Sequence, residues 1–193
     1  MIYFKLYLLL GLLAHKALWE ALKRRGPGNG SVAPAVKPRV QVVKLVKLAI
    51  LLGILAQTMI PWDVFPIIAV ADDAIPLRAA GGILYTIGLL VAVLGRLHLG
   101  NNWSDIEVNR IQDRHQTVTS GIYAYLRHPI YVGDLILLFG LELALNSWLV
   151  LGVLALTPLV LMKAVKEERV LAANLTGYDD YSRRVKRFIP YVV

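Results

Sequence analysis

Charged side chains gather where an apolar run begins in the second half of the chain. Arg127 and His128 directly precede Pro129, and the sequence that follows is apolar enough to enter a lipid bilayer. Two adjacent carboxylates, Glu167 and Glu168, follow the next apolar run. A carboxylate pairs strongly with a cationic group where water is partly excluded. Charged side chains at such a threshold raise the question of what they face.

A simpler interpretation of the same residues stays open. Arg127 is typical of an interfacial anchor, and Glu167 and Glu168 are typical of solvated charges on a helix that leaves the bilayer. The flanking tyrosines would then form an aromatic belt, and they are Tyr123, Tyr125 and Tyr131.

Two further carboxylates, Asp134 and Glu142, lie inside an apolar stretch. A carboxylate within a membrane span is energetically costly and suggests an inward-facing functional group. Asp134 is only about one helical turn past Pro129, so water can also account for it.

The composition indicates a membrane protein. Of the 193 residues, 57% are hydrophobic and 18% are charged, a balance that a water-soluble domain of this length cannot bury. Cysteine is absent, which excludes disulfides and thiol catalysis.

We expect five helices, at 2–22, 42–60, 77–99, 130–145 and 147–162. A spanning helix needs about 20 residues, a length that the first three stretches meet.

The last two stretches are shorter and are separated only by Asn146, which predicts a tight helical hairpin. Pro129 suits the first turn of the helix that begins the hairpin, where the missing N–H has no energetic consequence.

Residues 2–22 also raise the alternative of a signal peptide. Against it, the stretch has one lysine before its apolar part, and "HKALWE" is a poor cleavage site.

Basic residues are concentrated in three segments that five spans place on one side of the membrane. Eighteen of the 21 Lys and Arg residues lie within 23–47, 96–128 and 163–187, whereas the opposite loop, 61–76, has three aspartates and no basic residue. The positive-inside rule makes the basic side cytoplasmic, with the N-terminus outside and the C-terminus in the cytoplasm. The net charge of +8 is therefore a signal of topology and of contact with membrane lipids, and not of nucleic acid binding.

Ordered blocks in the second half carry a more specific signal. They are "LGNNWS" (99–104), "HQTVTSGIYAYLRHPIYVG" (115–133), "EERVL" (167–171), "GYDDY" (177–181) and "RRVKRFIP" (183–190). Together they resemble the isoprenylcysteine carboxyl methyltransferase family, which is grouped with the phospholipid N-methyltransferases. The resemblance implies an integral-membrane enzyme that uses S-adenosyl-L-methionine as methyl donor and a lipid-bearing or prenylated molecule as substrate.

The resemblance also implies where the methyl donor binds. In the family, the donor is enclosed at the cytoplasmic surface by the stretch before the hairpin, the start of the hairpin and the tail. The matching cofactor-binding residues are His115, Gln116, Thr117, Val118, Tyr123, His128, Pro129, Ile130, Tyr131 and Glu167. Lys163 stands where the family has an arginine assigned to the substrate carboxylate, and Arg127 is expected at the lip between cofactor pocket and substrate entry.

These assignments are chemically coherent. Glu167 can pair with the ammonium group of the donor, and the aromatic faces of Tyr123 and Tyr131 can hold its sulfonium or adenine. A carboxylate acceptor is ionised at neutral pH and needs no general base, so Lys163 would orient it. No metal is required, and no Cys/His cluster offers a site for one.

Lysine at position 163 leaves the methyl acceptor open, because exchanging a bidentate guanidinium for a point charge is not conservative at a carboxylate site. The first hypothesis is O-methylation of the carboxylate of a prenylated cysteine or similar lipid-bearing acid. The second keeps the methyl donor but transfers the methyl group to a phospholipid amine. The third is a non-catalytic membrane protein whose charged rim only sets topology.

The predicted fold is an all-α integral membrane protein with five transmembrane helices. Residues 1–99 would form three of them, with a basic cytoplasmic loop at 23–41. Residues 100–193 would form the methyltransferase core, with the hairpin at 129–162. Its cytoplasmic cofactor pocket would be built from the 100–128 stretch and the C-terminal tail.

Overall fold

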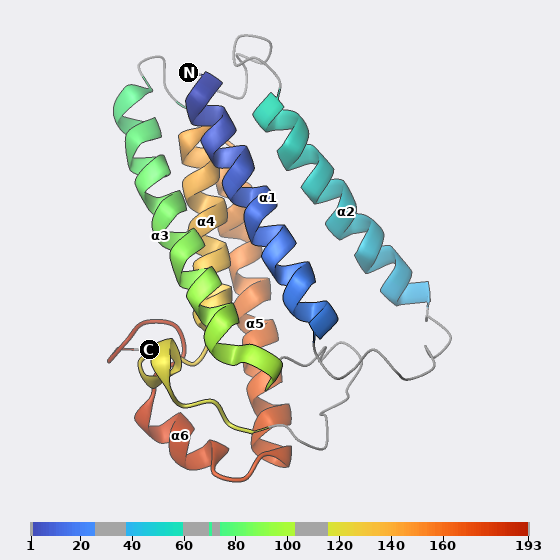
Figure 1. Cartoon of the computed structure of the whole chain (residues 1–193), viewed down its shortest axis with the longest axis vertical. Helices are drawn as coiled ribbons and strands as arrows, with labels where there is room; N and C mark the ends of the chain where they lie inside the picture. The colour runs from blue at the N-terminus through green and yellow to red at the C-terminus, as the bar shows by residue number, and fades with distance from the viewer. Residues whose placement is uncertain (1, 26–37, 60–69, 71–73, 103–115, 193) are drawn as a thin grey trace.

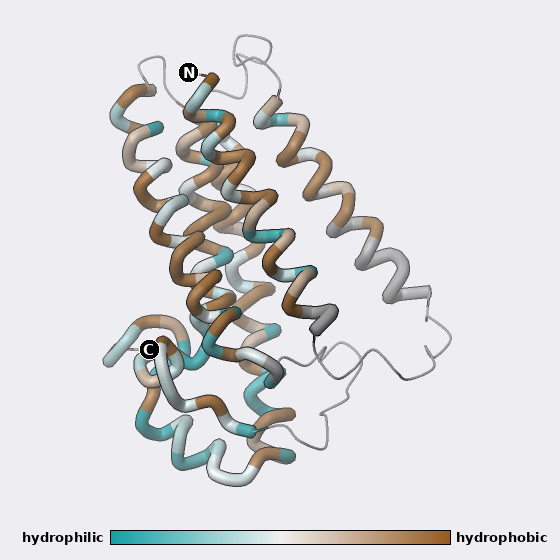
Figure 2. The backbone as a smooth tube through the Cα atoms, in the orientation of Figure 1, coloured by the Kyte–Doolittle hydropathy of each residue, from teal (hydrophilic) through white to brown (hydrophobic). Residues whose placement is uncertain are grey.

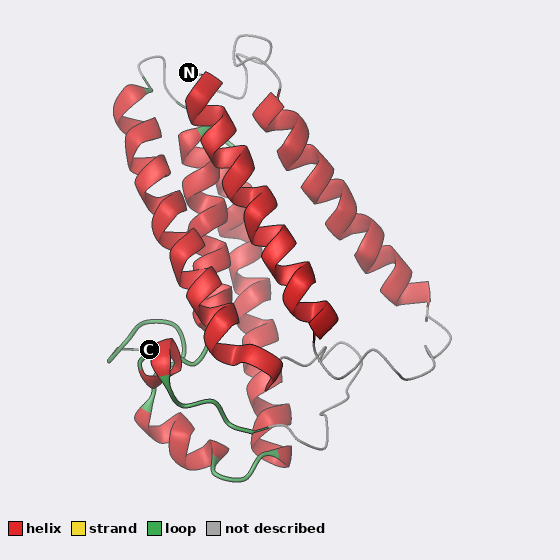
Figure 3. Cartoon of the chain, in the orientation of Figure 1, coloured by secondary structure: helices red, strands yellow, loops and turns green. Residues whose placement is uncertain are grey.

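The computed structural model describes residues 2–25, 38–59, 70, 74–102 and 116–192, and all regular structure in these residues is helical (Figure 3). The prediction of an all-α fold is confirmed. The α-helices are α1 (Ile2–Arg25), α2 (Pro38–Met59), α3 (Ile75–Leu99), α4 (Pro129–Ala144), α5 (Val150–Asn174) and α6 (Tyr178–Arg184). Two short 3-10 helices are η2 (Gly100–Asn102) and η4 (Gly121–Ala124). Helices α1, α3, α4 and α5 form a bundle, and α6 lies across one end of it (Figure 1).

The hairpin differs from the prediction in two respects. Pro129 opens α4 as expected, but α4 and α5 are joined by residues 145–149 and not by Asn146 alone. Asn146 takes a positive φ of 57°, a conformation that asparagine tolerates better than most residues. In addition, α5 does not end near residue 162 but continues to Asn174. The first part of the predicted tail is therefore a rigid extension of the hairpin.

Glycines let α3 and α4 pack with their backbones in contact. A side chain at Gly88 would overlap the backbone of Leu137, and one at Gly140 would overlap the backbone of Tyr85. The same holds for Gly133 against Ala92. Because these residues lack a Cβ, the two helices approach closely, which fixes the position of the start of α4 relative to the end of α3.

The core of the bundle lies where α1 crosses α3 and α4. Tyr85 is fully buried, and its hydroxyl donates to the backbone oxygen of Leu8 at 2.6 Å. The buried apolar residues around it are Leu8, Leu137, Leu141, Ala144 and Leu145. A buried tyrosine needs such a hydrogen-bond partner, so Tyr85 joins α1 to α3 at a defined depth.

Two of the described helices are long and apolar enough to cross a membrane by length and composition, namely the Ile2–Leu22 part of α1 and α3. Hydrophobic residues run along the bundle helices, whereas hydrophilic residues concentrate around α6 (Figure 2). The five-span topology, the orientation of the termini and the division into 1–99 and 100–193 stay predictions.

The carboxylates within the apolar stretches face other helices. Glu142 is buried, and its Oε2 accepts a hydrogen bond from Nε2 of Gln57 at 3.0 Å. This contact ties α2 to the turn end of the hairpin. Asp134 Oδ1 lies 3.6 Å from Nε2 of His15 on α1. Glu142 points inward, as the sequence suggested, whereas the Asp134 side chain is 39% exposed, so both interpretations of Asp134 stay open.

Candidate functional site

The start of α4 is held by the segment that follows α6. We call residues 185–192 the strap. The N–H of Arg127 donates to the oxygen of Lys186 at 2.9 Å, and the N–H of His128 donates to the oxygen of Arg187 at 3.1 Å, in a short parallel pairing. Two segments that are far apart in the sequence thus meet at the end of the bundle.

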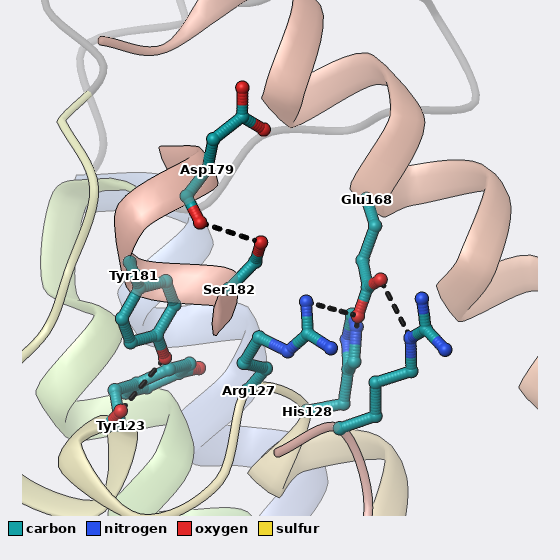
Figure 4. A network of polar contacts seen from close by, with 8 residues as sticks. Tyr123, Arg127, His128, Glu168, Asp179, Tyr181 and Ser182 are labelled. Atoms are coloured by element: carbon teal, nitrogen blue, oxygen red, sulfur yellow. Dashed lines mark hydrogen bonds and ion pairs between the residues drawn. The ribbon is translucent and has the colours of Figure 1, made fainter. Parts of the chain in front are cut away.

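Glu168 of α5 is the centre of a buried ionic network (Figure 4). Its Oε1 lies 2.9 Å from Nε2 of His128 and 3.3 Å from Nη1 of Arg127. Its Oε2 accepts from Nε of Arg187 at 2.8 Å. Glu168 is only 6% exposed, so the expectation that both adjacent glutamates are solvated charges is wrong for this one. One carboxylate joins α5, the start of α4 and the strap.

The charge state of Glu168 follows from these contacts. Burial raises the pKa of its carboxyl group, but the hydrogen bonds with His128 and Arg187 and the charge of Arg127 lower it by more. The net pKa lies below the ordinary value of 4.5. Glu168 is therefore an anion at neutral pH, as three basic partners require.

Three tyrosines dock α6 onto η4. The hydroxyl of Tyr181 donates to the backbone oxygen of Tyr123 at 2.8 Å, and Tyr178 packs edge-on against Tyr181. Burial raises the pKa of Tyr178 to about 12. It also raises the pKa of Tyr123 and of Tyr181, so all three phenols stay neutral at physiological pH. This docking fixes the turn before α4 against the helix after α5.

The end of α3 also supports η4, through His98. Nδ1 of His98 accepts the N–H of Ile122 at 3.2 Å. The preceding Gly121 has a φ of 62°, and a side chain there would overlap the His98 ring. Glycine adopts this conformation without steric penalty, which lets η4 lie directly on His98.

The second glutamate, Glu167, faces an aromatic group. The hydroxyl of Tyr131 donates to its Oε2 at 2.7 Å. Nζ of Lys163 lies 5.9 Å from the centre of the Tyr131 ring. The His128 ring is stacked between Tyr131 and Phe188, with centroids 5.6 Å apart on each side. The structure thus brings together four residues that the sequence singled out, namely Tyr131, His128, Glu167 and Lys163.

Tyr123 belongs to the same neighbourhood. It is buried, and the charge of Glu167 is one of the causes that raise its pKa, after burial and Tyr181. Arg127 is half-buried, with its side chain 9% exposed and turned toward Glu168. It does not lie exposed at a rim, and its place at a lip of the pocket stays a prediction.

The remaining predicted residues fall into two groups. Pro129 and Ile130 pack on α3 beside Gly95, so their side chains position the helix. The N–H of Gln116 donates to Oδ1 of Asn102 at 3.0 Å, and Thr117 and Val118, which follow it, are half-buried. His115 lies outside the described residues. None of these contacts tests a role in cofactor binding.

Thr117 has an unsatisfied group. Its Oγ1 is buried and has no hydrogen-bond partner among the residues that the structure describes. A buried hydroxyl without a partner is energetically unfavourable. The carboxylate of Glu167, the aromatic face of Tyr131 and this free hydroxyl are groups that fit a ligand with an ammonium group, a cationic sulfur and a flat heterocycle.

The sequence analysis gave no site role to Glu168, Arg187 or Phe188. Glu168 lies four residues after the buried Ala164 and shares its face of the helix, but that burial is seen only in the structure, and the sequence carries no signal for it. Arg187 and Phe188 reach the site through the strap, whose path the sequence pattern does not specify.

The comparisons with known proteins identify the family. Residues 77–176, more than half of the chain, match the family described as "Phospholipid methyltransferase". The chain belongs to the phospholipid methyltransferase family. The match begins in α3, includes the hairpin and ends after α5, and so contains most of the site.

Curated relatives extend the family assignment. The chain is 30% identical over 119 residues to protein-S-isoprenylcysteine O-methyltransferase of Rattus norvegicus, covering 60% of this chain and 42% of the relative. It is 34% identical over 113 residues to the cobalt-zinc-cadmium resistance protein CzcN of Cupriavidus metallidurans, covering 56% of this chain and 50% of the relative. The chain thus spans half or less of the length of these relatives.

A solved structure supports the fold. The eukaryotic intramembrane Ras methyltransferase ICMT, an isoprenylcysteine carboxyl methyltransferase, superposes with a TM-score of 0.55 at 22% identity. The superposition covers 93% of this chain and 63% of that one. The predicted resemblance to the isoprenylcysteine carboxyl methyltransferase family, within the phospholipid methyltransferase group, is confirmed.

Proposed function

We propose that this protein is an integral-membrane methyltransferase that uses S-adenosyl-L-methionine to methylate the carboxylate of an isoprenylcysteine-like or other lipid-bearing acid. The observation that carries the proposal is the cluster of Tyr131, Glu167 and Lys163 beside the buried His128. It places an anion, an aromatic face and a cation at the polar end of an apolar bundle. We further propose that this end faces the cytoplasm.

The residues fit the methyl donor as follows. Glu167 would hold the ammonium group, since a partly buried carboxylate is a strong partner for it. Tyr131 both orients Glu167 through its hydroxyl and offers a ring face to a cation. Thr117 has an unused buried hydroxyl for a polar group of the donor. The donor, when bound, supplies an already activated methyl group.

The chain's own task is then alignment. Lys163 is exposed, above the Tyr131 ring, and would bind and orient an acceptor carboxylate. Such a carboxylate is ionised at neutral pH and needs no proton removal. The rigid contact of α3 with α4 and the Glu168 network hold Tyr131 in place, and correct positioning alone accounts for a large part of catalysis.

The proposal is tested by calorimetric titration of S-adenosylhomocysteine into the detergent-purified protein, with Glu167→Ala beside the wild type. We expect saturable binding to the wild type and its loss in a variant that stays folded. No binding to a folded wild type would instead favour the non-catalytic hypothesis. Retained binding in Glu167→Ala would overturn the assignment of Glu167.

A second acceptor, a phospholipid amine, is favoured by one specific observation. Lysine occupies position 163, and an amine acceptor has no carboxylate for a guanidinium to clamp. Amine methylation needs the neutral amine, so its rate should rise with pH. A rate that is flat across neutral pH would favour the carboxylate.

A further inference from the structure

The outer part of the strap exposes a group of large apolar side chains. Tyr191 is 81% exposed, Val192 64% and Ile189 54%. They follow directly on Arg187 and Phe188, which contact the Glu168 network and the His128 ring. The strap therefore has an inner half that closes the site and an outer half whose apolar residues contact nothing that would bury them within the described chain.

A tight turn presents these side chains. The N–H of Val192 donates to the oxygen of Ile189 at 3.1 Å, and Tyr191 has a φ of 65°. With Pro190 at the second position and a positive φ at the third, this geometry is that of a type II turn, which favours glycine at the third position. A tyrosine there is strained, and backbone strain of this kind is a reason to look for a function of the segment.

The residues before the turn are basic. Arg183, Arg184 and Lys186 are all exposed, and neither Arg183 nor Lys186 forms an ion pair with another described residue. Segment 183–192 contains four basic residues and no acidic one, and only Arg187 is engaged by Glu168. Two acidic residues of α6, Asp179 and Asp180, leave a positive excess. A surface of this kind suits an anionic partner.

The position of the segment identifies that partner. The strap lies at the level of the last turns of α3 along the long axis of the bundle (Figure 1), and α3 is long and apolar enough to span a membrane. Aromatic residues are enriched at the headgroup level of a bilayer, and nearby basic residues are attracted to anionic lipids.

We propose that segment 183–192 binds the anionic headgroup layer of the membrane, with Arg183, Arg184 and Lys186 on the lipid phosphates and Tyr191 and Val192 inserted beside them. This contact holds Arg187 and Phe188 against the site. The inference does not rest on the proposed function, since it concerns a lipid surface and not the methyl donor.

The test uses the absence of cysteine in the chain. A spin label on Val192→Cys, in single-protein nanodiscs of phosphatidylcholine with phosphatidylglycerol, is compared with a label on Ala173→Cys, an exposed position of α5. Electron paramagnetic resonance measures collision with oxygen, which partitions into lipid, and with a water-soluble nickel complex. We expect the label at 192 to favour oxygen and the label at 173 to favour nickel. Equal nickel accessibility at both positions would overturn the proposal.

Two variants in the Val192→Cys background separate its parts. Arg183→Gln, Arg184→Gln and Lys186→Gln together should lower the ratio of docked to undocked strap by up to about a hundredfold. Tyr191→Gly should undock the strap while leaving the melting temperature in detergent unchanged or higher, since glycine relieves the strained φ. Protection that persists in the triple variant, or in phosphatidylcholine alone, would show that the segment is held by contacts other than anionic lipid.

Discussion

The imidazole of His128 lies 2.9 Å from the carboxylate of Glu168, a residue forty positions later in the chain. Because Glu168 also binds Arg127 and Arg187, this one contact belongs to a network that joins the start of α4, the extension of α5 and the strap. Tyr131, which faces Glu167, stacks on the same imidazole. The buried glutamate thus positions the His128 ring, on which Tyr131 and Phe188 stack.

Replacing Glu168 with glutamine should destabilise the protein. The change keeps the shape but leaves the buried His128 and the largely enclosed Arg127 side chain without an anion, and breaking a buried pair costs about 3 kcal/mol. We expect a clearly lower melting temperature in detergent and faster proteolysis of residues 178–192. An unchanged melting temperature would mean that the network is dispensable.

The adjacent Glu167→Gln is the matched control. Glu167 is half-buried and its described partner is the Tyr131 hydroxyl, which a glutamine can still bind. We therefore expect the stability to change by less than about 1 kcal/mol and the affinity for S-adenosylhomocysteine to fall at least about tenfold, because the charge opposite the ammonium group is lost. The opposite pattern in the two variants would exchange the roles assigned to the two glutamates.

The lowered pKa of Glu168 predicts an acid-sensitive site. Burial alone would raise this pKa, but the hydrogen bonds with His128 and Arg187 and the charge of Arg127 lower it below 4.5. A carboxyl group with a lowered pKa in the folded state stabilises the protein fully above its unfolded pKa. The stabilisation is lost as the pH falls through the lower, folded value.

We therefore expect the free energy of unfolding to drop below about pH 4.5, and this drop to be smaller in Glu168→Gln than in the wild type. Denaturant titrations at a series of pH values in one detergent give both curves. Curves that stay parallel between pH 6 and 3 would exclude Glu168 as a source of the acid sensitivity.

Much of this arrangement could be predicted from the sequence, because its signals are local. Apolar length identified the helices, and Pro129 marked the start of α4, since proline fits the first turn of a helix. The choice between Glu167 and Glu168 could not be made from their spacing alone. Adjacent residues on a helix point about 100° apart, and which one is buried depends on where the strap docks. That docking uses backbone bonds to Lys186 and Arg187, which carry no side-chain signature.

The contact between α3 and α4 should not tolerate added volume. In Gly88→Ala the new methyl group would overlap the backbone of Leu137, so the helices must separate. Overpacking of this kind costs about 1–3 kcal/mol. Gly152→Ala in α5 is the control, because nothing lies within 4 Å of its Cβ position and alanine is the better helix former. Equal melting temperatures in detergent for the two variants would contradict the close packing.

The role of Lys163 can be decided by exchanging one cation for another. Nζ of Lys163 lies 5.9 Å from the Tyr131 ring centre, and an arginine there can stack on the same ring and present two parallel donors to a carboxylate. If the proposed acceptor is a lipid-bearing acid, Lys163→Arg should keep or raise kcat/KM, whereas Lys163→Gln should lower it at least about tenfold. Both rates are measured by transfer of a labelled methyl group to a prenylated cysteine derivative. If both variants instead match the wild type on the acid, residue 163 does not hold the acceptor. A rate with a phospholipid amine that rises with pH would then favour the amine as substrate.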